Sequence, residues 1–171
     1  MGDIMKIITG GQSGGDLAGI YFAKKYHIPC KINTFKDFYP ITGNLPDDVE
    51  IEYVCDTGNY ISNLRERTKY NVQNSDFTLI LLNTDIMFTK GSKLTYNLCM
   101  KLKKDVMYID INTHIGSFHD KTWSSGNTRV IQSIESAREI IKSKNIQVLN
   151  VAGQREINEY NALEFLEKLL L

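Results

Sequence analysis

Short apolar runs alternate with longer stretches of helical periodicity along the chain. The apolar runs predict strands at about residues 5–9, 77–82, 106–110 and 146–151, and a weaker alternating run predicts an edge strand at 49–55. Helical spacing predicts helices at about 16–26, 60–73, 93–103, 130–143 and 158–170. The βα alternation predicts a Rossmann-like, doubly wound α/β fold with a mainly parallel sheet, formed by residues 1–171 as a single domain.

The pattern also indicates which elements are buried. The run 77–82 is apolar on both faces, as expected of a central strand covered by helices. In the predicted helix 130–143, one apolar stripe is formed by Val130, Ile134, Ala137 and Ile141. Residues 35–48 and 112–128 do not fit the pattern and are expected to form long loops, which are often functional.

Composition narrows the possible partners. The 20 Lys and Arg residues balance 20 Asp and Glu residues, so no overall field attracts nucleic acid or an anionic membrane. The three cysteines are far apart in the sequence and form no C-x-x-C pair, which favours a reduced, cytoplasmic setting. No apolar run approaches the roughly 18 residues that a membrane span needs. We therefore expect no nucleic-acid or membrane partner and no secretion.

The first candidate site is the glycine-rich turn that follows the first predicted strand. Four glycines allow the backbone to approach a ligand closely, and the start of the next helix favours an anion. The alternative is a tight βα turn that binds no ligand. The turn is neither a dinucleotide fingerprint nor a Walker A loop. The candidate phosphate-binding residues are Gly10, Gly11, Gln12, Ser13, Gly14, Gly15 and Asp16.

A second candidate group surrounds the predicted central strand. Arg67 and Asn71 lie four residues apart on one helix face and point toward the carboxyl end of that strand. The strand ends at Asn83, and a second polar turn, residues 89–92, leads into the next helix. Ligands in open α/β sheets bind at this edge, so Arg67, Asn71, Asn83, Gly91 and Ser92 are expected to line a crevice. The alternative for Arg67 is a solvated, charged helix face.

The last predicted strand is also followed by a glycine and polar residues. Arg155 can pair with a phosphate, and Glu156 can accept a hydrogen bond from a sugar or act as a general base. Gly153 would let the chain turn here. The alternative is that Arg155 and Glu156 cap the final helix.

Other features give weaker signals. His114 and His119 lack a cluster of partner ligands and are expected at the surface rather than on a metal. Ser13 is not surrounded by a nucleophile elbow. Three aromatic residues of the first long loop could stack on a base or cover the edge of the core: Phe35, Phe38 and Tyr39.

Four sequence blocks, in order, resemble a known family. They are residues 8–16 (ITGGQSGGD), residues 66–81 (ERTKYNV, NSD and TLIL), residues 91–95 (GSKLT) and residues 148–156 (VLNVAGQRE). The chain resembles the putative molybdenum-cofactor carrier proteins, circularly permuted relatives of the lysine-decarboxylase-like Lonely Guy superfamily.

This resemblance implies a Rossmann-like fold, self-association and a nucleotide-type or pterin-type ligand such as an AMP-like nucleotide or molybdenum cofactor. It places the ligand at the glycine-rich turn, Arg67, the third block with Thr95, and residues 153–156.

The chain also departs from the family. The family often has a basic C-P-K-G-R stretch where this chain has residues 32–38, and it usually has Gly-Gly-Thr where this chain has Lys90-Gly91-Ser92. Asn83 stands where the superfamily has the proline of that turn. Phosphoribohydrolases of the superfamily use an arginine together with a helical glutamate, whose counterpart here is Asn97. An amide cannot serve as the general acid or base that cleavage of an N-glycosidic bond needs.

Three functions remain open. The leading hypothesis is a cytoplasmic carrier or sensor that binds a phosphate-bearing small ligand. The second is a hydrolase of nucleoside 5′-monophosphates, with Arg67 holding the phosphate and Glu156 or Asp16 assisting departure of the base. The third is a structural or interaction protein that has kept the fold and binds no ligand.

Overall fold

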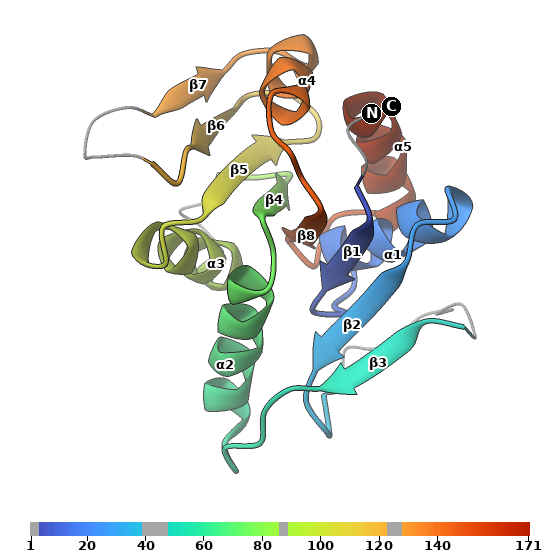
Figure 1. Ribbon diagram of the computed structural model, residues 1–171, viewed down its shortest axis with the longest axis vertical. Coiled ribbons are helices and arrows are strands. Elements are labelled where there is room, and N and C mark those ends of the chain that lie inside the picture. The colour runs from blue at the N-terminus through green and yellow to red at the C-terminus, as the bar shows by residue number, and fades with distance from the viewer. Residues whose placement is uncertain (1–3, 39–47, 86–88, 123–127) are drawn as a thin grey trace.

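The computed structural model describes residues 4–38, 48–85, 89–122 and 128–171. Within these ranges the chain forms eight strands and five helices (Figure 1). The strands are β1 (Lys6–Thr9), β2 (Cys30–Thr34), β3 (Glu50–Tyr53), β4 (Phe77–Leu82), β5 (Asp105–Asp110), β6 (Gly116–His119), β7 (Arg129–Ile131) and β8 (Val148–Gly153). The helices are α1 (Gly15–Lys25), α2 (Tyr60–Gln73), α3 (Lys90–Lys101), α4 (Ile134–Lys142) and α5 (Glu159–Leu170).

All eight strands join one sheet in the order β3-β2-β1-β8-β4-β5-β6-β7. The pairs from β3 to β5 are parallel, and β6 and β7 add an antiparallel extension beyond β5. The chain moves outward from β1 on one side and from β4 on the other, and β8 returns to lie between them. The predicted Rossmann-like, mainly parallel α/β fold is confirmed, with its topological switch point between β1 and β4.

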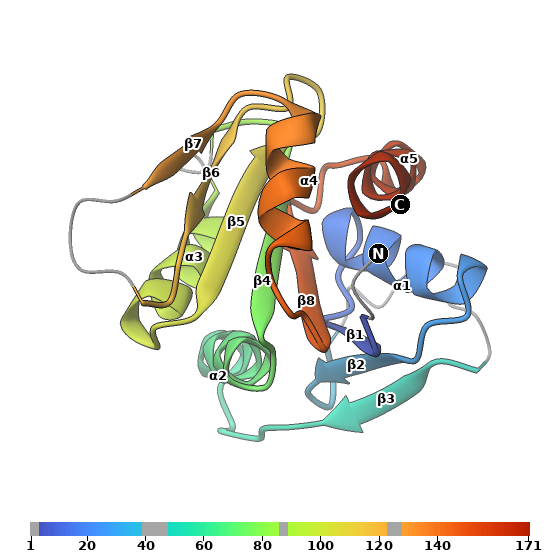
Figure 2. The same ribbon diagram turned by 45° about the horizontal axis from the view of Figure 1, so that its top comes forward.

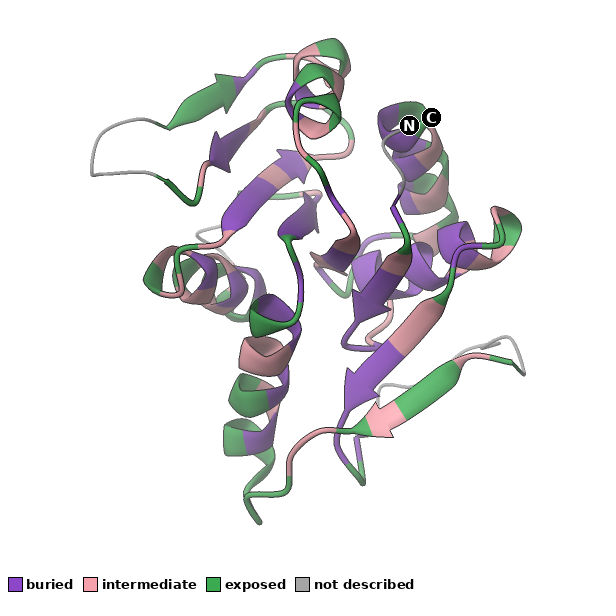
Figure 3. Cartoon of the chain, in the orientation of Figure 1, coloured by how far each residue is buried: buried purple, intermediate pink, exposed green. Residues whose placement is uncertain are grey.

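Helices cover both faces of the sheet. Helices α1, α4 and α5 pack on one face, and α2 and α3 pack on the other (Figure 2). Every residue of β4 is buried, whereas the edge strand β3 is largely exposed (Figure 3). The apolar run of β4 is therefore explained by a helix layer on each side. Among the described residues, no helix has the length and apolar character that a membrane crossing requires.

The region before α4 differs from its prediction. Val130 was expected on the buried face of a helix starting at residue 130, but it lies in β7 and its side chain is 65% exposed. The helix begins only after Ser133, whose hydroxyl accepts a hydrogen bond from the Ser136 amide in a capping box. Ala137 and Ile140 form its buried face. The four-residue spacing that included Val130 was coincidental, because a strand and a cap separate it from the helix.

Three strands were not predicted: β2, β6 and β7. Strand β2 carries the polar residues Lys31 and Asn33, and β6 has the sequence GSFH, so neither has a strong strand signature. Both are held by pairing with longer neighbours, β1 and β5. Part of the expected loop 112–128 is therefore strand β6, while Trp123 and Tyr39 lie outside the described residues.

Candidate functional site

A cleft of about 670 Å³ opens at the carboxyl ends of β1 and β8, where the strand order reverses. Ligands of open α/β sheets bind at this position. The cleft lies between the glycine-rich turn, α2, the start of α3 and the segment after β8. It is lined by Gly10, Gln12, Asp16, Ile61, Ser62, Leu64, Arg65, Arg67, Thr68, Asn71, Thr89, Lys90, Gly91, Ser92, Leu94, Thr95, Asn150, Ala152, Gly153, Gln154, Arg155 and Glu156.

The glycine-rich turn is built for close packing. Gly11 and Gly14 both have φ of 77°, a conformation that favours glycine. A Cβ atom on Gly14 would lie 2.2 Å from the carbonyl oxygen of Gln154, and one on Gly10 would lie 2.8 Å from the guanidinium carbon of Arg67. The glycines therefore allow the turn to contact both α2 and the end of β8.

Only part of this turn faces the cleft. Gly10, Gln12 and Asp16 line it, whereas the other predicted residues pack elsewhere. Gly11 packs against Ile32, the Ser13 hydroxyl donates to the Arg155 carbonyl at 3.5 Å, and Gly14 and Gly15 lie against the segment after β8 and its last residue. The expected placement of Gly11, Ser13, Gly14 and Gly15 on the cleft wall is therefore corrected, because these positions fix the turn to its neighbours.

The amides of the turn are largely used within the protein. The Gly11 amide donates to the Thr9 hydroxyl at 2.9 Å, and the Gly15 amide donates to the Gln154 carbonyl at 3.3 Å. The Gln12 amide donates to Oδ2 of Asp16 at 3.2 Å. The carboxylate of Asp16 thus takes the place at the turn that the sequence suggested for a bound anion.

Asp16 and Arg67 form the charged floor of the cleft. Asp16 is 4% exposed and Arg67 is 6% exposed. Burial raises the pKa of Asp16 to about 6, although the Arg67 charge and backbone amides oppose the rise. Burial also lowers the pKa of Arg67, and the charge of Asp16 opposes this effect. The structure brings together two of the three predicted catalytic candidates at the floor.

Arg67 is held in a fixed position. Its Nη1 donates to the Gly10 carbonyl at 2.9 Å, and its guanidinium carbon lies 4.8 Å from the centre of the Phe38 ring. Its buried Nε makes no hydrogen bond with the described residues. The alternative of a solvated helix face is thereby excluded for Arg67.

The aromatic residues of the first long loop support Arg67. Phe38 packs edge-on against Phe35, with ring centres 5.1 Å apart, and Tyr60 contacts both rings. Phe35 and Phe38 are buried and do not line the cleft. The sequence left open whether these residues stack on a base or cover the edge of the core. Phe35 and Phe38 cover the edge of the core.

Asn71 lines the cleft one helical turn beyond Arg67, as their spacing predicted. Its Oδ1 accepts a hydrogen bond from Nδ2 of Asn33 at 2.8 Å. Asn33 is 2% exposed, and its Oδ1 makes no hydrogen bond with the described residues. Sequence reasoning missed Asn33, because β2 itself was not predicted.

The start of α3 forms another wall. The helix begins at Lys90 rather than near residue 93, so Gly91 and Ser92 lie in its first turn and not in a preceding loop. Its first backbone amides lack partners within the helix and carry partial positive charge. Gly91, Ser92 and Thr95 line the cleft as predicted, whereas Asn97 is exposed and does not.

The segment after β8 closes the cleft. Gly153, Arg155 and Glu156 line it. Helix α5 is capped by Asn158, whose side chain accepts from the amides of Tyr160 and Asn161, so Arg155 and Glu156 are not its cap. Asn83, which was expected in the crevice, does not line the cleft, and its backbone amide donates to Oε1 of Gln154 at 2.8 Å.

The lining has an excess of positive charge. Four basic side chains (Arg65, Arg67, Lys90 and Arg155) face two acidic ones (Asp16 and Glu156), and the lining residues include no cysteine or histidine. Across the described residues, no group of three or more histidine, cysteine or acidic side chains is arranged to hold a metal ion. The donor set fits an anion such as phosphate or molybdate better than a bare metal cation.

The histidines lie away from the cleft. His119 was expected at the surface but is 5% exposed, and its Nε2 lies 2.5 Å from the Tyr96 hydroxyl. That prediction was wrong because β6, which carries His119, is covered by α3. His114 is half-buried with φ of 59°.

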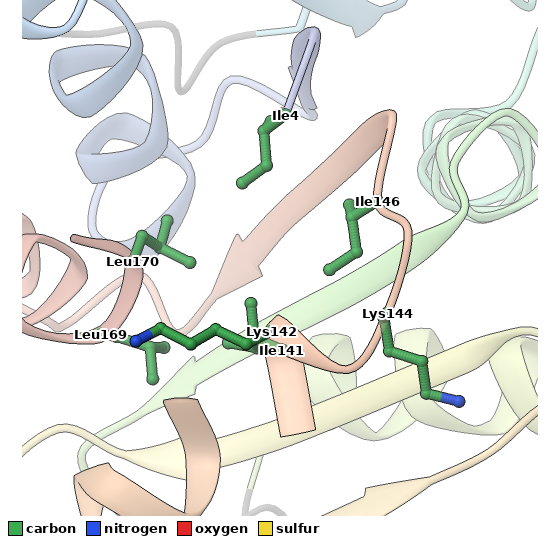
Figure 4. Close-up of a pocket in the computed structure, with 7 residues that line it drawn as sticks. All are labelled: Ile4, Ile141, Lys142, Lys144, Ile146, Leu169 and Leu170. Carbon is green, nitrogen blue, oxygen red and sulfur yellow. The ribbon is translucent and has the colours of Figure 1, made fainter. Parts of the chain in front are cut away.

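A second hollow, of only about 20 Å³, lies near the amino ends of β1 and β8 (Figure 4). Its lining is mostly apolar, and its volume is close to that of one water molecule. It is therefore a packing defect at the end of the sheet opposite the cleft.

Fold and cleft together define a Rossmann-like α/β protein with an open cleft, rich in basic side chains, at its topological switch point. The chain belongs to the circularly permutated YpsA SLOG family, whose model matches residues 7–171. A crystal structure from Syntrophus aciditrophicus SB, of a protein named "Putative molybdenum carrier protein", is similar to the chain with a TM-score of 0.71 and 32% identity. That similarity covers 98% of this chain and 96% of the other. A search of curated proteins found no match. The family inferred from the four sequence blocks is thereby confirmed.

Proposed function

We propose that the protein is a carrier or sensor that binds a phosphate-bearing small molecule, either nucleotide-like or molybdenum-cofactor-like, in the cleft at the switch point. The observation that carries the proposal is the excess of basic side chains in the cleft lining, with the guanidinium of Arg67 buried among them and held in place by Gly10 and Phe38. An anionic oxygen is the acceptor that a guanidinium binds most strongly.

The remaining walls suit the other parts of such a ligand. The start of α3 offers backbone amides with partial positive charge, and Lys90 and Arg155 stand at the opening. Ile61, Leu64 and Leu94 provide apolar surface on α2 and α3 against which a planar ring can pack. The cleft volume of about 670 Å³ is within the range of small-molecule sites.

The name of the similar protein from Syntrophus aciditrophicus refers to molybdenum, which makes molybdate a further ligand worth testing beside molybdenum cofactor, a phosphate-bearing pterin. The lining residues include no thiol or imidazole, so in this proposal they hold the anionic groups of such a cargo and not the metal itself.

Binding is tested in two steps. Native mass spectrometry of the purified protein is expected to show a co-purified small molecule released by denaturation. Calorimetry with AMP, GMP, a pterin phosphate and molybdate, each compared with adenosine or buffer alone, is expected to find at least one anion that binds at one site per chain. The absence of heat with every anion, together with a bare protein mass, would exclude the proposal.

A second function, hydrolysis of a nucleoside monophosphate, is favoured by one observation. Asp16 is a carboxyl beside Arg67 with a pKa raised to about 6 by burial, which is suitable for a general acid or base near neutral pH. Glu156 also lines the cleft. In this reaction water adds to C1′ of the ribose while the base leaves with a proton. Incubation with AMP distinguishes the functions: free adenine that disappears in Asp16→Asn or Glu156→Gln supports hydrolysis.

A further inference from the structure

Gln154 is the most extensively hydrogen-bonded side chain at the cleft, although the sequence did not mark it as a site residue. It is 3% exposed and follows the last residue of β8. Its Oε1 accepts hydrogen bonds from the backbone amides of Asn83 and Thr84, at 2.8 and 3.2 Å. Its Nε2 donates to the hydroxyls of Thr84 and Thr89, at 2.9 and 3.1 Å, and makes a longer contact of 3.5 Å with the Thr84 carbonyl.

These bonds use the whole capacity of the side-chain amide group. A glutamine amide has two acceptor lone pairs on oxygen and two donor hydrogens on nitrogen. All four are engaged with the segment that joins β4 to α3. Gln154 therefore has no hydrogen bond left to offer a ligand, even though it lines the cleft.

The backbone of Gln154 contacts the opposite wall. Its carbonyl accepts from the Gly15 amide at 3.3 Å, and Gly14 packs so closely against this carbonyl that a Cβ atom would lie 2.2 Å from the oxygen. Its own amide donates to the Leu81 carbonyl of β4 at 3.1 Å. One residue thus joins the glycine-rich turn to the segment that sets the position of α3.

We propose that Gln154 is a positioning residue, which holds the start of α3 at a fixed distance from the glycine-rich turn and so sets the affinity of the cleft for its anionic ligand. This role rests on the proposed ligand binding. Thr89 is the residue that precedes α3, and its hydroxyl accepts from Gln154, so the side chain fixes where the first amides of the helix point. No other residue type offers two donors and two acceptors at this length.

The test uses Gln154→Met, which keeps the length of the side chain and removes all of its hydrogen bonds. Gln147→Met is the matched control, because Gln147 precedes β8 at its other end and, among the described residues, its side chain bonds only Asn145. Amide hydrogen exchange of the ligand-free proteins is measured together with calorimetric binding of AMP and of inorganic phosphate.

In Gln154→Met we expect exchange at the amides of Asn83 and Thr84 to accelerate by about tenfold or more, with exchange in the centre of β4 unchanged. Affinity for AMP is expected to fall by about tenfold, because the start of α3 and the glycine-rich turn are no longer preorganised to bind the anion. Gln147→Met should alter neither the exchange at these two amides nor the affinity for AMP. A general loss of stability would instead accelerate exchange throughout β4.

Thr84→Val provides a second variant that leaves the core intact, because Thr84 is exposed. It removes the 2.9 Å bond and is expected to weaken AMP binding severalfold, with no further loss when combined with Gln154→Met. Unchanged AMP affinity in Gln154→Met, or unchanged exchange at Asn83 and Thr84, would overturn the proposal. If the unaltered protein binds neither AMP nor phosphate, the proposed binding of these anions fails, and exchange alone decides whether Gln154 holds the segment.

Discussion

Arg67 of α2 donates a 2.9 Å hydrogen bond from Nη1 to the carbonyl of Gly10, a residue 57 positions earlier in the chain. The bond fixes the glycine-rich turn to the helix on the other side of the cleft. The bond also holds the guanidinium beside Asp16 before any ligand binds. A group that is already in position loses less conformational entropy on binding, so this arrangement favours tight recognition of an anion.

Replacement of Arg67 by methionine is expected to lower AMP affinity by about 100-fold, because a buried, charge-assisted contact is lost. Isothermal titration calorimetry measures the change. The control is Arg138→Met, since Arg138 lies on α4, away from the cleft lining. Equal affinity of the two variants would show that the anion is held elsewhere.

The glycines of the site are expected to differ sharply in their tolerance of alanine. Gly14→Ala places a side chain at φ of 77° and within 2.2 Å of the Gln154 carbonyl, so it should lower the free energy of unfolding by about 3 kcal/mol or more. The new methyl group of Gly91→Ala meets open space in the first turn of α3. This substitution should raise the free energy of unfolding by less than about 1 kcal/mol. Urea denaturation of both variants checks the pair, and similar losses would contradict the geometry.

The fold was predictable where one physical signal dominates. Strand β4 is apolar except for Thr78, and its prediction matches the bounds that the structure shows, as does that of α2. Strand β6 was missed because its residues have little intrinsic preference for a strand and depend on pairing with β5. The start of α4 was misplaced because the apolar stripe was extended across the Ser133 cap to Val130.

The cleft was predictable in outline for a similar reason. Polar residues after parallel strands must meet at one edge of the sheet, and this rule brought Gln12, Ser92 and Arg155 to the same cleft. It could not show that the Asp16 carboxylate would accept the Gln12 amide, or that Gln154 would join two walls. The first depends on the exact conformation of the turn, although the two residues are only four positions apart. The second depends on packing between segments distant in sequence, for which the chain carries no local pattern.

Phe38 is expected to influence binding through Arg67. Phe38→Leu keeps an apolar side chain but removes the ring that lies 4.8 Å from the guanidinium carbon. We expect AMP affinity to fall by about threefold to tenfold, because cation–π contacts contribute about 1 kcal/mol. Phe35→Leu is the matched control, since it perturbs the same aromatic cluster without that contact to Arg67. A loss of affinity that is equal in both variants would assign the effect to packing alone.

Asp16 is expected to make both stability and binding depend on pH. Its pKa is about 6 in the folded protein, above the ordinary 3.8, so the folded state holds this proton more tightly than the unfolded state. The contribution to stability is therefore fully present below pH 3.8 and is lost as pH rises to about 6. A shift of this size corresponds to about 3 kcal/mol, which Asp16→Asn should remove. Urea denaturation of both proteins from pH 3.5 to 7.5 measures the difference.

The same proton should assist an anionic ligand. Below pH 6 Asp16 is neutral, so the floor of the cleft presents the Arg67 charge alone, whereas above pH 6 the carboxylate repels a phosphate. AMP itself titrates near pH 6, so the informative quantity is the affinity of the unaltered protein divided by that of Asp16→Asn at each pH. This ratio should fall as pH rises from 5 to 7.5. A ratio that stays constant would place the bound phosphate too far from Asp16 for the two charges to interact.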